Sequence, residues 1–114
     1  MNIQPYAIPG IVNVVNYKYS PARVMKIICE YFNISEDEIK ATTRKRYITT
    51  ARYIFFWCMM EYQKYFYLPL NDIGKFTRGN HCHVLAGRKK IDDLMDVDVK
   101  VLNDVEEIQK IIES

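Results

Sequence analysis

The run YIFFWCMM, residues 53–60, most constrains how this chain can fold. It is apolar on every side of a helix, and no glycine or proline interrupts the wider stretch 47–65. A helix that is apolar all round has to be buried, and a bilayer-spanning helix needs about twenty apolar residues. We therefore predict a long helix over 47–65 at the centre of a helical bundle, and no membrane span.

Helix-start signals and apolar spacing predict five more helices. Ser20 followed by Pro21 is typical of an N-cap and first helical residue, and Ser35 with Glu38 is typical of a capping box. Apolar residues at helical spacing continue through the rest of the chain. The expected helices are one ending near Asn33, a short one opened at Ser35, then 70–76 and 81–95, and a last one with the stripe Val101, Val105, Ile108 and Ile112. Together they predict an all-α six-helix bundle.

Residues 1–19 do not follow this pattern. Pro5, Pro9 and Gly10 break helices, and the segment IVNVVNYKY, residues 11–19, is rich in β-branched and aromatic residues. We predict an extended N-terminal arm over 1–19 and one globular domain over 20–114, since 114 residues suit a single core. The arm is either a terminus laid loosely on the bundle or a contact for a partner.

The net charge of +2 conceals an uneven distribution. Residues 40–52 and residues 73–91 each contain five basic side chains and no acidic one. Residues 92–114 contain eight acidic side chains against two lysines, a net charge of −6, so residues 1–91 sum to +8. This asymmetry indicates a surface that faces a polyanion such as nucleic acid, the alternative being ordinary solvated helix faces.

The segment 70–90 has the pattern of a helix-turn-helix: a short helix, a turn containing Gly79 and a longer helix. In this motif the second helix enters the major groove of DNA with its first residues against the base edges. The polar residues at the turn and the start of the second helix are Arg78, Asn80, His81 and His83. We predict that these four face outward to contact DNA, while Val84 and Leu85 begin the buried side of the helix.

Two motifs lie in the basic segments: TTRKRYITTARYI, residues 42–54, and LNDIGKFTRGNHCHVLAGRKKI, residues 70–91. The first resembles the basic loop and following helix of the C-terminal DNA-binding domain of the bacterial chromosomal replication initiator DnaA. The second is similar to that family's L-P-E-I-G…R-D-H-T-T-V-L-H-A…K-I pattern, and the resemblance runs from about Pro21 to Ile112. It implies a Trp-repressor-like all-α domain that binds specific duplex DNA in replication initiation or transcriptional regulation.

The resemblance also assigns roles to individual residues. It implies a helix-turn-helix in the major groove, with Asn80 to His83 at the base-reading positions, and a basic loop that places Arg44 in the minor groove. Arg52 matches a phosphate contact. Further basic residues that we expect at phosphates or in the minor groove are Lys45, Arg46 and Lys75. Neutralising about four to five phosphates predicts a log–log salt slope near −4.

The recognition motif departs from the family's. The family's base-reading set is Asp-His-Thr-Thr, whereas this chain has Asn80, His81, Cys82 and His83. An aspartate can accept from cytosine N4, whereas an asparagine suits bidentate pairing with adenine, and the missing threonines remove contacts to thymine methyl groups. We therefore predict a preferred target different from the DnaA box.

Several other functions find no support in the sequence. It has no G-x-x-x-x-G-K-[ST] loop, so we expect no ATPase activity and no bound nucleotide. No grouping of nucleophile and base indicates an enzyme, and no cofactor is expected. The adjacent residues 81–83, His-Cys-His, point about 100° apart on a helix and lack a second ligand pair, so no metal site is expected. Without a signal-peptide pattern, we expect a cytoplasmic protein.

A rival function stays open at this point. The chain can be a protein-interaction adaptor that keeps the fold without binding DNA, which would account for the missing threonines. The acidic last helix and the N-terminal arm are then the expected contacts for a protein partner. Both basic segments favour duplex DNA as the partner instead, and we expect a monomer.

Overall fold

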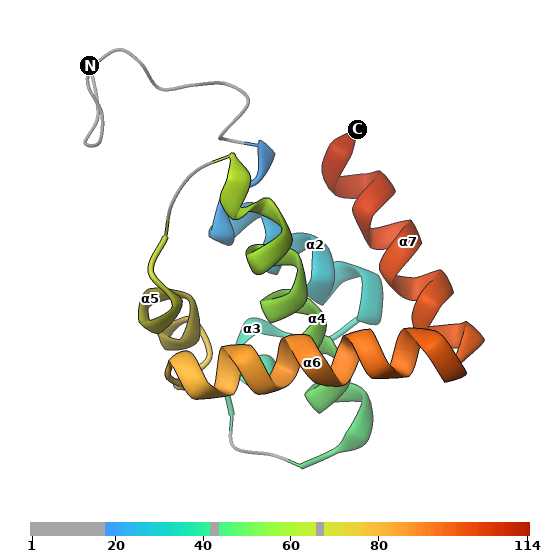
Figure 1. Ribbon diagram of the computed structural model, residues 1–114, viewed down its shortest axis with the longest axis horizontal. Coiled ribbons are helices and arrows are strands. Elements are labelled where there is room, and N and C mark those ends of the chain that lie inside the picture. Colours follow the sequence, from blue (N-terminus) through green and yellow to red (C-terminus); the bar gives the residue numbers. More distant parts are fainter. Residues whose placement is uncertain (1–17, 42–43, 66–67) are drawn as a thin grey trace.

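The computed structural model describes residues 18–41, 44–65 and 68–114 (Figure 1). These residues form six α-helices and one 3-10 turn, without a strand, which confirms the predicted all-α six-helix fold. The helices are α2 (Pro21–Phe32), α3 (Glu36–Lys40), α4 (Arg46–Glu61), α5 (Leu70–Lys75), α6 (His81–Val97) and α7 (Val99–Glu113), and the 3-10 turn η1 (Tyr62–Lys64) extends α4. None of these helices is long and apolar enough to cross a membrane.

Helix α4 occupies the centre of the molecule, as its sequence predicts. Six consecutive side chains, Ile54 to Met59, are buried, so the helix contacts protein on all sides. It packs against α6 on one side and α2 on another (Figure 1). The regular helix ends at Glu61, four residues before the predicted end at Tyr65, because the chain tightens into η1. Burial of this apolar stretch supplies most of the core.

The predicted caps of the first two helices are confirmed. The Ser20 hydroxyl accepts a hydrogen bond from the Arg23 backbone N–H at 3.3 Å, and Pro21 is the first residue of α2. Ser35 and Glu38 form the reciprocal capping box of α3, at 3.0 and 2.9 Å. These contacts span three residues, and the sequence therefore specifies them locally.

A close crossing sets the position of α6 on α4. A Cβ atom added to Gly87 would lie 2.7 Å from Cδ2 of Phe56 and 2.9 Å from Cδ1 of Tyr53. Next to the crossing, Trp57 Nε1–H donates to the carboxylate of Asp92 at 2.8 Å. The Arg88 guanidinium lies 5.1 Å from the centre of the Trp57 ring. Packing and polar contacts therefore fix the axis of α6, which carries the second half of the helix-turn-helix.

Helix α7 closes the bundle. Its predicted stripe, Val101, Val105, Ile108 and Ile112, is buried against α2 and α6. At its end, Arg23 Nη1 donates to the carbonyls of Ile112 and Lys18, both at 2.8 Å. Residues 1–17 of the predicted arm lie outside the described residues. Tyr19, the last residue of that arm, is buried and stacks on Tyr65 with ring centres 4.2 Å apart.

One prediction about the core was wrong. Val84 is fully buried, but its neighbour Leu85 is 46% exposed and does not begin the buried side of α6. Successive helical residues point about 100° apart, so the position after a fully buried one turns toward solvent unless a second element covers it. Helix α6 packs against α4, α5 and α7, and this packing leaves Leu85 about half exposed.

Candidate nucleic-acid interface

The helix-turn-helix depends on a close approach between Gly74 of α5 and Asn80, the N-cap residue of α6. A Cβ atom on Gly74 would lie 2.8 Å from the backbone oxygen of Asn80, so only glycine fits there without a shift of backbone. The Gly74 carbonyl accepts from the backbone N–H groups of Thr77, at 2.9 Å, and of Gly79, at 2.8 Å. The buried Thr77 hydroxyl donates to the same carbonyl at 3.2 Å. The turn therefore holds α5 and α6 in one relative orientation.

The left-handed residue of this turn is Arg78. Its φ is 64°, a conformation that usually favours glycine, whereas the φ of the adjacent Gly79 lies outside the left-handed range. Gly79 is therefore not the conformational pivot of the turn. The side chain of Arg78 is exposed.

Asn80 is the N-cap of α6, and its amide oxygen is engaged by the helix. Oδ1 accepts from the backbone N–H groups of Cys82, at 2.9 Å, and His83, at 3.3 Å. The bidentate pairing with adenine considered from the sequence needs the same oxygen. In this arrangement Asn80 offers only its Nδ2 amino group to a ligand.

His81, Cys82 and His83 are the first three residues of α6, and all are exposed. Asn71 of α5 holds the first of them: its Oδ1 accepts from the His81 backbone N–H at 2.9 Å and lies 3.2 Å from the ring Nδ1. Sequence reasoning missed Asn71, because the contact spans ten residues and no local pattern signals it. Among the described residues, no group of three or more His, Cys, Asp or Glu side chains could hold a metal ion.

A hollow of about 220 Å³ brings the two basic segments together. Arg44 and Arg46, at the start of α4, face it from one side, and Lys90 of α6 faces it from the other. The remaining lining residues are Thr49, Thr50, Tyr53 and Leu94. The N-cap of α4 is Lys45, which makes no capping hydrogen bond with its side chain. Unbonded N–H groups at a helix N-terminus, with cations beside them, favour an anion.

A second hollow, of about 160 Å³, adjoins the first. Arg52, Arg78 and His83 line it, together with Tyr53, which lines both hollows. Arg52 is anchored within the fold: its Nε donates to the Ile39 carbonyl at 2.8 Å, and its Nη2 to the Ala41 carbonyl at 2.7 Å. These bonds tie the end of α3 to α4. The interface therefore runs from the turn of the helix-turn-helix to the start of α4.

Several cations of the second basic segment are paired with carboxylates. Arg88 lies 2.6 Å from Glu61 and 3.3 Å from Asp92. Lys89 lies 3.2 Å from Asp93. Lys75, a predicted phosphate contact, lies 3.8 Å from Asp72 but is largely exposed, and such a pair contributes little and can be exchanged for a phosphate. The exposed cations at the interface without an ion pair to any described residue are Arg44, Arg46, Arg78 and Lys90.

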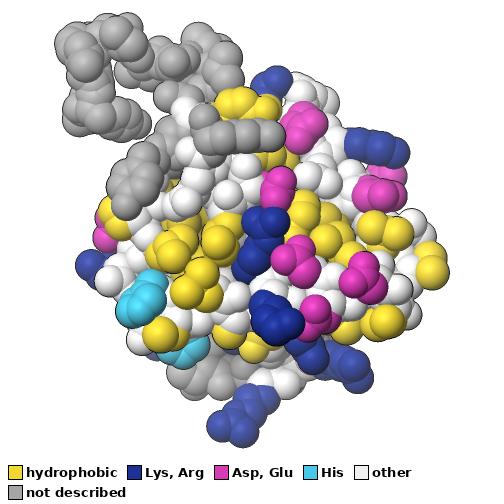
Figure 2. Space-filling view, in the orientation of Figure 1, with side chains coloured by type: hydrophobic (Ala, Val, Ile, Leu, Met, Phe, Trp, Pro, Cys, Tyr) yellow, Lys and Arg dark blue, Asp and Glu magenta, His cyan; other side chains and the backbone are white. Residues whose placement is uncertain are grey.

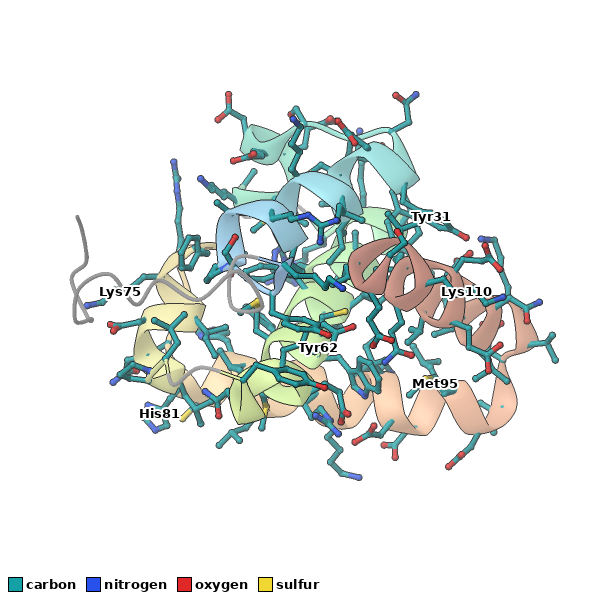
Figure 3. All side chains as sticks on the ribbon, turned by 90° about the horizontal axis from the view of Figure 1, so that it is seen from above. Tyr31, Tyr62, Lys75, His81, Met95 and Lys110 are labelled. Atoms are coloured by element: carbon teal, nitrogen blue, oxygen red, sulfur yellow. The ribbon has the colours of Figure 1, made fainter. Side chains whose placement is uncertain are left out.

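Acidic side chains are unevenly distributed over the surface. In Figure 2 they gather over the part formed by α6 and α7, with basic groups among them, and further basic groups project at the edge where α4 begins. Figure 3 shows His81 and Lys75 at one end of the molecule and Lys110 at the opposite end. An anionic ligand would meet the exposed cations at the turn of the helix-turn-helix and at the start of α4.

This fold and interface define a helix-turn-helix domain, a class of DNA-binding modules. The sequence profile of the bacterial DnaA helix-turn-helix matches residues 21–91, and the chain belongs to this family. It is similar to the chromosomal replication initiator protein DnaA of Bacteroides thetaiotaomicron, with 25% identity over 98% of this chain and 23% of the relative. For DnaA of Jannaschia sp. the identity is 26% over 91% of this chain and 22% of the relative.

A third relative, DnaA of Cutibacterium acnes, is 32% identical over 78% of this chain and 17% of its own length. The chain thus spans less than a quarter of the length of these relatives. The family membership that the two motifs suggested is therefore confirmed, and it concerns the helix-turn-helix domain.

Proposed function

We propose that this protein binds specific duplex DNA, with the N-terminus of α6 in the major groove and the basic residues before α4 in the minor groove. One observation carries the proposal: Tyr53 lines both the hollow between Arg44, Arg46 and Lys90 and the hollow at Arg78 and His83. A single duplex could then meet the helix-turn-helix and the basic segment together. The two contacts would define one binding site without a second copy of the chain.

The first turn of α6 supports the major-groove assignment. His81, Cys82 and His83 are exposed at consecutive positions, so side chains of different polarity are available to base edges. The phosphate contacts that hold the register would come from Arg46, Arg78 and Lys90, since phosphates position a protein while bases specify its site. The proposed target differs from the DnaA box, because three of the four base-reading residues differ from the family's pattern.

The relatives named chromosomal replication initiators suggest the process. We propose a role in replication initiation or in transcriptional regulation, exercised by DNA binding in the cytoplasm. Neither catalysis nor ATP hydrolysis by these residues forms part of the proposal, since the sequence has no phosphate-binding glycine loop.

A fluorescence-anisotropy titration of the whole chain against mixed-sequence duplex DNA, at two salt concentrations, tests the proposal. Binding should weaken with salt, and Arg44→Ala or Arg46→Ala should each weaken it further. Lys110→Ala is the matched control: it removes the same charge at the opposite end of the molecule and should bind as the wild type does. Absence of binding at low salt, or equal losses in all three variants, would overturn the proposal.

The junction between α6 and α7 favours the second candidate, a protein-interaction adaptor. Val97 is 80% exposed and Val99 is 71% exposed, on either side of Asp98. Further carboxylates of α6, Asp93 and Asp96, belong to the same helix end. An exposed apolar tip among acidic groups suits a protein partner with a basic surface. If the titration finds no DNA binding, this tip becomes the first surface to test.

A further inference from the structure

The contact between Asn71 and His81 specifies which ring nitrogen of His81 carries the proton. Asn71 Oδ1 accepts from the backbone N–H of His81 at 2.9 Å, and that N–H can only donate. The orientation of the Asn71 amide is thereby determined, with its oxygen toward His81. The same oxygen lies 3.2 Å from the ring Nδ1. Because an amide oxygen only accepts, Nδ1 must be the protonated nitrogen of the neutral ring.

The contact on the other side of the ring is compatible with this assignment. Cys82 Sγ lies 3.5 Å from His81 Nε2, within reach of a weak S–H···N hydrogen bond. A thiol sulfur is both a weak donor and a weak acceptor, so this contact fits either protonation state of Nε2. The Asn71 contact therefore makes the assignment, with Nδ1–H and an acceptor at Nε2 of His81.

His83 is held in the opposite tautomer. The backbone N–H of Asn80 donates to His83 Nδ1 at 3.1 Å, which requires Nδ1 to be unprotonated. Nδ1 also lies 3.0 Å from Asn80 Oδ1. That oxygen, however, already accepts hydrogen bonds from two backbone N–H groups. The Asn80 N–H, in contrast, makes no other hydrogen bond within the described residues. With Nδ1 as the acceptor, the Asn80 N–H and the His83 ring complete the capping box of α6. His83 then presents a donor at Nε2.

We propose that Asn71 is a positioning residue that sets the base preference of His81 by selecting its tautomer. With an acceptor at Nε2, His81 can receive a hydrogen bond from the amino group of adenine or cytosine once the Cys82 thiol rotates aside. It cannot donate to the acceptors of guanine or thymine. His83, with a donor at Nε2, has the complementary preference. This inference rests on the proposed DNA binding, but the tautomers themselves belong to the free protein.

Long-range ¹H–¹⁵N NMR spectra of the free, full-length chain at alkaline pH, where histidine rings are neutral, test the tautomers. His81 should show a protonated Nδ1 and an unprotonated Nε2, and His83 the reverse, so each ring is the internal control for the other. In Asn71→Ala, His81 should change to the Nε2–H form while His83 stays as it is. A protonated Nε2 on His81 in the wild type would overturn the proposal, whether or not the protein binds DNA.

Selection of binding sites from random duplexes tests the consequence for recognition. Asn71→Ala should move the preference at one base position from adenine or cytosine toward guanine or thymine, with mixed-sequence affinity changed no more than a few-fold. Asn71→Asp keeps an acceptor oxygen and should restore the wild-type preference, which a general loss of structure would not allow. An unchanged base preference in Asn71→Ala would overturn the proposed role of Asn71. If the tautomers are as expected but the protein does not bind DNA, only the proposed function is overturned.

Discussion

Asn80 and His83 cap the N-terminus of α6 reciprocally: Asn80 Oδ1 accepts from the His83 backbone N–H at 3.3 Å, and His83 Nδ1 accepts from the Asn80 backbone N–H at 3.1 Å. Two of the residues that the sequence predicts to read bases therefore also begin the helix that carries them. The groups left for DNA are Asn80 Nδ2 and His83 Nε2. Stability and recognition are coupled at these two positions.

Replacing Asn80 tests the capping half of this coupling. Asn80→Ala should lower the free energy of unfolding by about 1 kcal/mol, the usual loss for an N-cap. Asn80→Asp keeps an oxygen in place of Oδ1 and should stay close to the wild type in urea denaturation. Equal destabilisation by both variants would contradict the capping role.

Arg78→Gly should separate stability from DNA binding. The left-handed backbone at φ 64° strains any residue with a Cβ atom, so glycine should stabilise the fold by about 1 kcal/mol. The same change removes a cation from the interface and should weaken DNA binding. Arg78→Ala removes the charge but keeps the Cβ atom, so it should weaken binding without the gain in thermal stability. Destabilisation by the glycine would refute this account of the turn.

The approach of α5 to α6 predicts a strong effect of Gly74→Ala. The added methyl group would lie 2.8 Å from backbone oxygen, which cannot move without displacing the cap of α6. We expect a loss of about 1–3 kcal/mol in the free energy of unfolding. Gly79→Ala is the control, because its added methyl group would lie 3.1 Å from the His83 Cβ, a milder contact with a side chain. A smaller loss for Gly74→Ala than for Gly79→Ala would contradict the prediction.

The unpaired cations predict the salt dependence of DNA binding. Arg44, Arg46, Arg78 and Lys90 are exposed without an ion pair to a described residue, and neutralising about four phosphates gives a log–log slope near −4. Binding measured over a series of salt concentrations provides the slope. Lys90→Ala should make it shallower by about one. Lys110→Ala, which removes a lysine at the opposite end of the molecule from the helix-turn-helix, should leave it nearly unchanged.

The cysteines offer a footprint of the interface. Cys82 is exposed, whereas Cys29 and Cys58 are buried, and burial raises the pKa of the Cys29 thiol to about 11. Since the thiolate is the reactive form, a thiol reagent at neutral pH should modify Cys82 first. Saturating duplex DNA should slow that reaction several-fold if α6 enters the major groove. An unchanged rate with DNA bound would place Cys82 outside the contact.

The local features of the sequence determined much of the fold. The apolar run in 53–60, the caps at Ser20 and Ser35 and the stripe of the last helix depend on residues a few positions apart, and all are confirmed. The helix-turn-helix and its family also follow from two short motifs, with a match over residues 21–91. The assigned DNA contacts remain predictions, since a pattern of residue types names candidates without measuring binding.

Only the tertiary structure decided how the candidate residues are used. Residues 73–91 contain five basic residues. One of them, Arg88, forms ion pairs with Glu61 of α4 and Asp92 of α6, so its charge is neutralised within the fold. Arg52 likewise bonds to carbonyls at the end of α3, and Asn71 reaches His81 across the turn. Periodicity and composition describe one helix at a time. Ion pairs and hydrogen bonds between helices depend on how the apolar faces pack together, and that packing brings distant residues within bonding distance.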